Sequence, residues 1–233
     1  MPISTGPLVR IQDRALPPAL FRKLLRKVRR VGRERLERTY QTTFWFDLAR
    51  PSNVVEEAVL ALRHLVSPPP SVVGVEWWLS RMDTNRVGVD FHRDRDEKLA
   101  HRTGRIIHPK LSSVLFLNRV KGGLLAVSAG RPNARNPACA PGEIDFALVR
   151  PLPNRLAWFS GDRTHGVLDA YNRLPGKSSR VGHRLRVALV INWWPRRPLQ
   201  VPRFSETQVY RALATRWAVS ATTHSMHRRP GRG

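Results

Sequence analysis

The chain has 233 residues, 41% of them hydrophobic, which is enough for one large domain with a real core. Its one cysteine, Cys139, excludes an internal disulfide and favours a reducing compartment. The sequence lacks a signal-peptide pattern, and no apolar run approaches the ~20 residues of a membrane span. We therefore expect a cytoplasmic protein with no membrane contact. The formal net charge of +24 comes almost wholly from Arg residues, which are scattered through every segment. A compositional bias is therefore favoured over a nucleic-acid partner as the explanation of this charge. An anionic small-molecule or peptide substrate is a third possibility.

Two helices are predicted in the N-terminal part of the chain, residues 17–66. The first follows Pro17, because Pro suits a first helical turn, and it carries apolar residues at helical spacing with a basic opposite face. An aromatic and β-branched run at Thr42–Leu48 predicts a strand between the helices. Ser52 or Asn53 is the expected N-cap of the second helix, which a Ser-Pro-Pro-Pro run ends.

Short strands bounded by turns dominate residues 71–195. We predict strands at Val72–Arg81, Val87–His92, Leu111–Leu117, Leu124–Ser128, Ile144–Val149, Leu156–Ser160, Thr164–Leu168 and Leu185–Trp194. The fourth is expected to pair back on the third. Lys98–His108 is interpreted as an irregular loop and Glu206–Ala218 as a closing helix. Such strands predict a sandwich or barrel, within one domain over residues 1–219 that is followed by a basic, disordered tail at 220–233.

Four of the 17 acidic residues gather in the segment Val87–Glu97, and a histidine lies among them. Its alternating pattern predicts a strand in which Asp90, His92 and Asp94 project from one face. An imidazole beside a carboxylate supplies two of the three ligands of a ferrous site that leaves positions open for a co-substrate and oxygen. The alternative is a solvated strand end with a charged turn, because one His-x-acid pattern carries a high false-positive risk.

The remaining ligand should come from a later strand that lies beside the first. His165 meets this requirement, because it follows an apolar strand and a Gly-Asp turn. Its competitor, His183, is surrounded by Arg residues, which makes that position a poor one for a cation.

A guanidinium that could anchor a carboxylate by two parallel hydrogen bonds is expected at the start of the last long strand. Arg184 and Arg186 are two residues apart and share a face there. Arg186 precedes a run that is apolar on both faces, where an unpaired charge would be costly. The alternative is that both side chains reach solvent. The Trp pairs of this region can each place only one ring in a pocket, and core packing is favoured for them.

The order His92-x-Asp94, His165, Arg186 resembles that of the iron(II)- and 2-oxoglutarate-dependent dioxygenases, and most closely their prolyl-hydroxylase-like branch. Three passages resemble that family over Val72–Trp194, namely LSSVLFLNRVKGGLLAV, RPLPNRLAWFSGDRTHGV and RVALVINWW. One departure is the long gap between His165 and Arg186, which would make the loop at 171–182 an insertion or a substrate lid.

The resemblance implies a mainly β fold, the double-stranded β-helix of jelly-roll and cupin-like proteins, with N-terminal helices on one sheet and a short C-terminal helix. It implies that His92, Asp94 and His165 ligate Fe(II), and that Arg186, or else Arg184, binds the distal carboxylate of 2-oxoglutarate. With O2 as co-substrate, the implied reaction hydroxylates an unactivated C–H of an amino acid, peptide or protein side chain and releases succinate and CO2. Retention of Asp94 argues against halogenation.

Two alternatives to this interpretation stay open. The first is an oxidative nucleic-acid demethylase of the same superfamily, which the charge and the tryptophans favour. The second is a non-catalytic, basic nucleic-acid-binding β-sandwich protein, which would bind nucleic acid in a salt-sensitive way and hold no iron.

Overall fold

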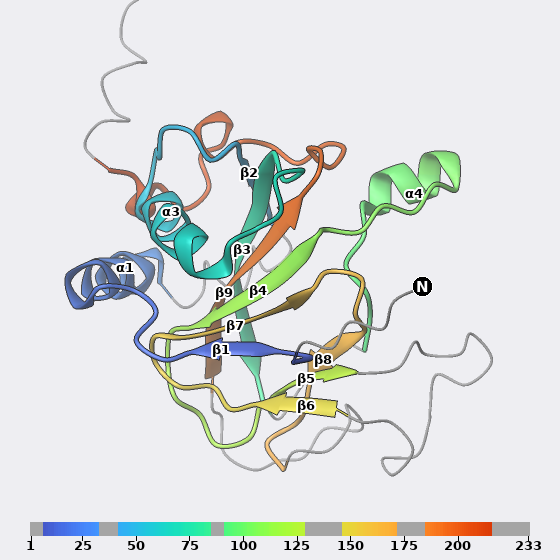
Figure 1. Ribbon diagram of the computed structural model, residues 1–233. Coiled ribbons are helices and arrows are strands. Elements are labelled where there is room, and N and C mark those ends of the chain that lie inside the picture. Colours follow the sequence, from blue (N-terminus) through green and yellow to red (C-terminus); the bar gives the residue numbers. More distant parts are fainter. Residues whose placement is uncertain (1–6, 33–41, 85–90, 129–145, 172–184, 216–233) are drawn as a thin grey trace, which may run out of the picture.

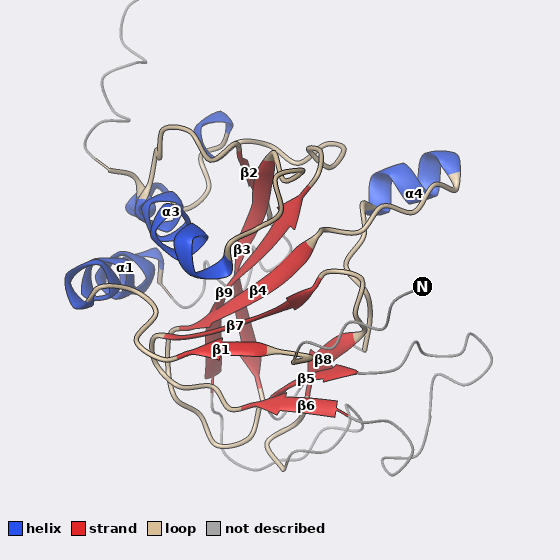
Figure 2. Ribbon diagram, in the orientation of Figure 1, coloured by secondary structure: helices blue, strands red, loops and turns tan. Residues whose placement is uncertain are grey.

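Two antiparallel sheets form the body of the protein (Figures 1 and 2). The computed structural model describes residues 7–32, 42–84, 91–128, 146–171 and 185–215, and the structural statements below concern these ranges. The six-stranded sheet has the order β1-β7-β4-β9-β3-β2, and the three-stranded sheet has the order β6-β5-β8. The strands are β1 Arg10–Gln12, β2 Phe44–Phe46, β3 Gly74–Asp83, β4 Leu111–Phe116, β5 Leu125–Ser128, β6 Phe146–Val149, β7 Arg155–Ser160, β8 His165–Val167 and β9 Leu185–Trp194.

From β4 onward the chain passes repeatedly between the two sheets, since β5, β6 and β8 belong to one and β4, β7 and β9 to the other. This crossing between two antiparallel sheets is compatible with a double-stranded β-helix and confirms the predicted fold class. The strand predicted at Leu185–Trp194 has the same bounds in the structure.

Helices α1 (Pro18–Val31) and α3 (Val54–Val66) cover the outer face of the six-stranded sheet, as predicted (Figure 1). Asn53 is the N-cap of α3, because its side chain accepts hydrogen bonds from the backbone N–H groups of Val55 and Glu56 at 2.9 and 3.0 Å. Leu24 of α1 and Leu62 of α3 are fully buried in the core between helices and sheet.

Strand alternation decides which residues of the six-stranded sheet meet the helices and which face the smaller sheet. Trp77 and Trp193 lie fully buried in the core under the helices. Val114 and Phe116 pack instead with residues of the smaller sheet. Trp78, next to Trp77, lines a cavity between the sheets, which agrees with the expectation that only one ring of a pair can do so.

The loop predicted at Lys98–His108 is wrong in its first half, where the structure has helix α4 (Glu97–Thr103). The Asp96 carboxylate caps this helix by accepting a hydrogen bond from the N–H of Leu99 at 3.0 Å. Leu99 is the one buried residue of α4, so the helix has no apolar stripe that periodicity could detect.

The predicted pairing of the fourth strand with the third is also wrong, because β5 pairs with β6 and β8 in the other sheet. Gly122 and Gly123, with φ of 69° and 62°, turn the chain away from β4 before β5 begins. In place of the helix predicted at Glu206–Ala218, the described residues have two short 3₁₀ turns, η1 (Phe204–Glu206) and η2 (Arg211–Leu213).

Several predictions lie outside the described residues, namely most of the strand at Val87–His92, Cys139, and the tail at 220–233. Arg184 and His183 lie outside them as well. Within the described ranges, no helix has the length and apolar character that crossing a membrane requires.

Candidate metal centre

His92 and His165 come together through an isolated antiparallel bridge between the segment after residue 90 and strand β8. Each residue donates its backbone N–H to the carbonyl of the other, at 3.0 Å from His92 and 2.9 Å from His165. Residues paired in this way project their side chains to the same side. The two imidazole rings accordingly lie with their centroids 4.8 Å apart.

The carboxylate of Asp94 lies between the two rings. Its Oδ1 is 3.4 Å from Nε2 of His92, and its Oδ2 is 3.4 Å from Nε2 of His165. The three residues offer one ligand atom each, and these atoms lie within 4.8 Å of one another. The structure therefore brings together the three residues that the sequence marked as metal ligands.

Neighbouring side chains hold Asp94 in this position. Ser112 on β4 donates its hydroxyl to Oδ2 at 3.1 Å, and the side chain of Asn192 on β9 hydrogen-bonds the same carboxylate. The Nδ1–H of His108 donates to the backbone carbonyl of Asp94 at 2.6 Å. Sequence reasoning placed His108 in a loop without a role and gave none to Ser112 or Asn192. Their only sequence signal was polarity within or beside apolar strands.

The protonation states of the group suit a cation. Burial acts to raise the pKa of Asp94, but the charges and hydrogen bonds of His165, His92 and Asn192 outweigh it and lower the pKa to about 2. Burial lowers the pKa of His165 below its usual value of 6.5, and Asp94 offsets this only in part. Asp94 is therefore ionised and His165 neutral at pH 7.

The tautomer of His165 also suits a metal. Its Nδ1 lies 3.0 Å from the carbonyl oxygen of Arg163, which can only accept, so Nδ1 carries the proton. In a neutral ring, Nε2 then has a free lone pair, and it is Nε2 that faces Asp94. Two imidazoles around one ionised, largely buried carboxylate leave a negative charge that a divalent cation would neutralise, so the donor set fits a 2-His-1-carboxylate metal site.

Pairing register places part of the site in one row across the inner face of the six-stranded sheet. Glu76 on β3 lies opposite Asn192 on β9, which lies opposite Ser112 on β4, which in turn lies opposite Phe159 on β7. Phe159 contacts the ring of His165, with centroids 5.0 Å apart. The metal group thus lies over this row, with a second acidic residue, Glu76, at the far end of it.

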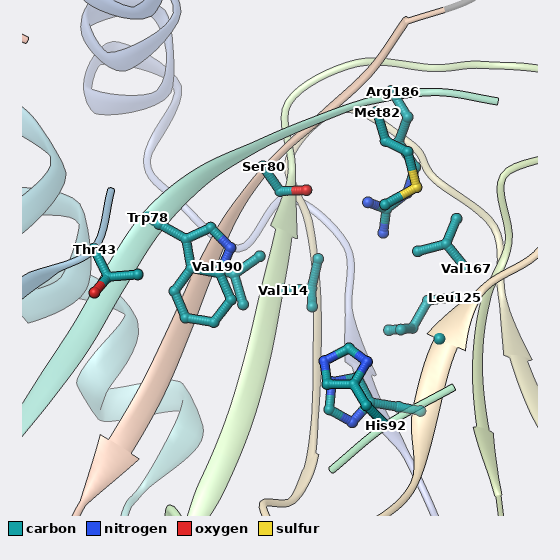
Figure 3. Close-up of a pocket in the computed structure, with 12 residues that line it drawn as sticks. Thr43, Trp78, Ser80, Met82, His92, Val114, Leu125, Val167, Arg186 and Val190 are labelled. Carbon is teal, nitrogen blue, oxygen red and sulfur yellow. The ribbon is translucent and has the colours of Figure 1, made fainter. Parts of the chain in front are cut away.

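A cavity of about 310 Å³ extends from the metal group between the two sheets. That volume lies at the lower end of the range for small-molecule sites, roughly 300–1,000 Å³. Figure 3 shows Arg186, Met82 and Val167 at one end of the cavity, His92 below its middle, and Thr43 and Trp78 at the opposite end. The site therefore has two arms, one basic and one aromatic.

Arg186 lies at the start of β9, opposite Met82, and its side chain is only 2% exposed. Its guanidinium lies over the ring of Phe116 at 5.0 Å from the centroid. Gly123 has a left-handed conformation with φ of 62°, and its backbone lies close to the Arg186 side chain. A Cβ at this position would come within 3.3 Å of Arg186 Cδ. A buried guanidinium in the cavity can bind a carboxylate by two parallel hydrogen bonds.

Fold and site together define a class: a double-sheet antiparallel β protein with a His-Asp-His group that can bind a metal and a buried Arg in the adjoining cavity. No protein-family model and no curated protein matches the chain.

Solved structures of similar shape include a prolyl-4-hydroxylase and a protein with 2-oxoglutarate bound. A prolyl-4-hydroxylase from Pseudomonas putida is 19% identical, with 82% of this chain and 89% of that chain covered and a TM-score of 0.45. HygX from Streptomyces hygroscopicus, solved with nickel and 2-oxoglutarate bound, is 13% identical, with 81% and 82% covered and a TM-score of 0.48. AviO1 from Streptomyces viridochromogenes Tue57 is 14% identical, with 83% and 92% covered and a TM-score of 0.49. The prolyl hydroxylases among them belong to the branch that the sequence motifs resemble.

Proposed function

We propose that this protein is an Fe(II)- and 2-oxoglutarate-dependent dioxygenase that hydroxylates an unactivated C–H bond of an amino acid, peptide or protein side chain. The observation that carries the proposal is the combination of a His-Asp-His group with a buried guanidinium in one cavity. A metal site alone would fit many activities. The Arg adds a carboxylate anchor at a distance from the metal, which is what a chelating oxo-dicarboxylic acid requires.

Each residue has a stated role in this proposal. His92, Asp94 and His165 would hold the ferrous ion and leave its other positions open. Arg186 would orient 2-oxoglutarate by pairing with its distal carboxylate. When bound, the ion with 2-oxoglutarate and O2 supplies the oxidation, which converts C–H to C–OH and yields succinate and CO2.

The rest of the chain contributes orientation and exclusion of water. Ser112 and Asn192 orient the carboxylate of Asp94, and His108 holds its backbone carbonyl, so the carboxylate oxygens are positioned to bind a cation. Apolar residues of the cavity wall, such as Val114 and Val190, keep the space between the sheets largely free of competing polar groups.

Melting temperature tests the proposal without knowledge of the substrate. Fe(II) added anaerobically should raise it, and 2-oxoglutarate should raise it further only when Fe(II) is present, because the acid chelates the metal. Succinate release should require both together with O2. A protein that gains stability from duplex or single-stranded nucleic acid, but not from Fe(II) with 2-oxoglutarate, would instead fit the non-catalytic alternative.

A further inference from the structure

Glu76 is an acidic residue that the metal centre does not use. It lies on β3 in the same row as Asn192 and Ser112, whose side chains hydrogen-bond the carboxylate of Asp94. The side chain of Thr43 hydrogen-bonds the carboxylate of Glu76. Thr43 lines the cavity, as does Trp78, which is two residues along β3 from Glu76 and therefore on the same face.

The surroundings of Glu76 are unusual for a chain with 41 basic residues. In the described part of the chain it forms no ion pair with Arg or Lys. The nearby charges that act on it are those of Asp94 and Asp96, which repel it, and burial raises its pKa to about 7. A half-buried carboxylate beside a cavity and without a cationic partner is costly unless a ligand supplies the partner.

The charges of the filled metal site point the same way. In the proposed complex, the two charges of Fe(II) and the one of Arg186 balance those of Asp94 and doubly charged 2-oxoglutarate. Among the described residues near the metal group, Glu76 in its ionised form is then a further negative charge that these groups do not balance. The net charge of +24 is spread over the whole chain and is screened beyond about 8 Å at physiological salt, so it does not decide what binds here.

We propose that Glu76, Trp78 and Thr43 form a subsite that binds a cationic nitrogen group of the substrate, an ammonium or a guanidinium. This rests on the proposed function, since the metal and Arg186 define which arm of the cavity is left for the substrate. A carboxylate and an indole face are the two groups that attract such cations. The net charge alone suggested an anionic substrate, and the local arrangement favours the opposite sign.

The position of the subsite also limits the size of the substrate. Two strand spacings separate Glu76 from Ser112, which is about 10 Å. A cation held at Glu76 therefore lies about one long side chain from the metal group over Ser112. A substrate with an aliphatic segment next to its charge, such as a basic amino-acid side chain or an alkylamine, would place a C–H of that segment at the metal.

Methylguanidinium and its neutral isostere N-methylurea test the subsite directly in a ligand-observed NMR titration of the full chain with Fe(II) and 2-oxoglutarate under nitrogen. The wild type should bind methylguanidinium at least tenfold more tightly than N-methylurea. Glu76→Gln keeps the shape of the side chain and one acceptor oxygen, and it should remove that preference. Glu97→Gln on the exposed helix α4 is the matched control, because it removes the same charge outside the cavity and should leave the preference intact.

Three results would overturn the subsite: equal binding of the two compounds by the wild type, unchanged preference in Glu76→Gln, or equal loss in Glu76→Gln and Glu97→Gln. If Glu76→Gln does not fold, Trp78→Leu replaces it and should lower the preference at least threefold; retention of the full preference in that variant would count against the subsite. A preference for methylguanidinium in a protein that gains no stability from Fe(II) with 2-oxoglutarate would support the subsite and contradict the proposed dioxygenase function. A protein that gains this stability but shows no preference for methylguanidinium would contradict only the subsite.

Discussion

His92 and His165 hydrogen-bond to each other through their main chains in both directions, so the spacing of their imidazole rings is set by backbone pairing. Both Nε2 atoms then face one carboxylate, that of Asp94. Because main-chain hydrogen bonds form this bridge, it does not require the side chain of any of the three ligand residues. Substitution of a ligand should therefore remove metal binding while leaving the fold in place.

Asp94→Ala should abolish the increase in melting temperature that Fe(II) gives, together with 2-oxoglutarate-dependent succinate release. The reason is that the variant leaves two imidazoles and no ionised ligand. Asp90→Ala is the matched comparison, since Asp90 is the other acid that strand spacing placed beside His92, and it lies outside the described residues. If Asp90→Ala removes the metal effect and Asp94→Ala does not, the ligand assignment is wrong.

Ser112→Ala and Ser113→Ala form a matched pair on β4, because adjacent residues point to opposite faces of the sheet. Ser112 hydrogen-bonds Asp94, so its loss should weaken Fe(II) affinity about 10- to 100-fold, the usual effect of removing a group that orients a ligand. Ser113 accepts a hydrogen bond from Trp193 Nε1 at 2.9 Å in the core under the helices. Ser113→Ala should lower stability by about 1–3 kcal/mol and leave Fe(II) affinity unchanged. Metal titration and urea unfolding of both variants measure the two effects.

Arg186→Ala should raise the 2-oxoglutarate concentration needed for half-maximal stabilisation of the Fe(II) form by about 100-fold, which corresponds to two charge-assisted hydrogen bonds of about 1.5 kcal/mol each. Arg186→Lys should recover part of this, because a lysine keeps the charge but not the two parallel bonds. Arg184→Ala should have little effect. A large effect of Arg184→Ala with none from Arg186→Ala would move the anchor to Arg184.

Gly166→Ala tests whether the packing of Phe91 positions the neighbouring His92. A Cβ at Gly166 would lie 2.7 Å from Cδ2 of Phe91, whose ring is already packed edge-on against Phe146 at 5.5 Å between centroids. Phe91 must shift and carry His92 with it, so we expect a loss of about 1–3 kcal/mol in stability and weaker Fe(II) binding. The double variant Phe91→Leu with Gly166→Ala should regain metal affinity, because leucine relieves the contact. No recovery would mean that the position of Phe91 does not control His92.

Glu76→Gln should change the pH dependence of stability in the metal-free protein. Burial raises the pKa of Glu76 from 4.5 to about 7, so between these pH values the folded state retains a proton that the unfolded state has lost. The wild type therefore loses stability as the pH rises through this window, by on the order of 3 kcal/mol in total. The amide does not titrate, so the variant should lack this loss. Urea unfolding at pH 5, 6, 7 and 8 in the presence of a chelator measures the difference, which should grow up to pH 7 and then level off.

Local pattern was a good guide to the long elements of this chain. The spacing of apolar residues predicted α1 and α3, and β9 has the bounds that its sequence suggested. The same approach failed at α4, which is capped by Asp96 and lies almost wholly in solvent. Its sequence therefore has no apolar residues at helical spacing from which the helix could be predicted. It also failed at η1 and η2, where Tyr210 takes a left-handed conformation with φ of 57° that an α-helix does not accommodate.

The sequence by itself determined which kinds of side chain were available for a metal site, since His92-x-Asp94, His165 and Arg186 could each be picked out from residue type and strand spacing. Only the tertiary structure decided that they meet, and that Ser112, Asn192, His108 and Glu76 join them. The physical reason is register: which residues lie opposite one another across β3, β9, β4 and β7 depends on the pairing of whole strands and on burial of both sheet faces, and no short stretch of sequence contains that information.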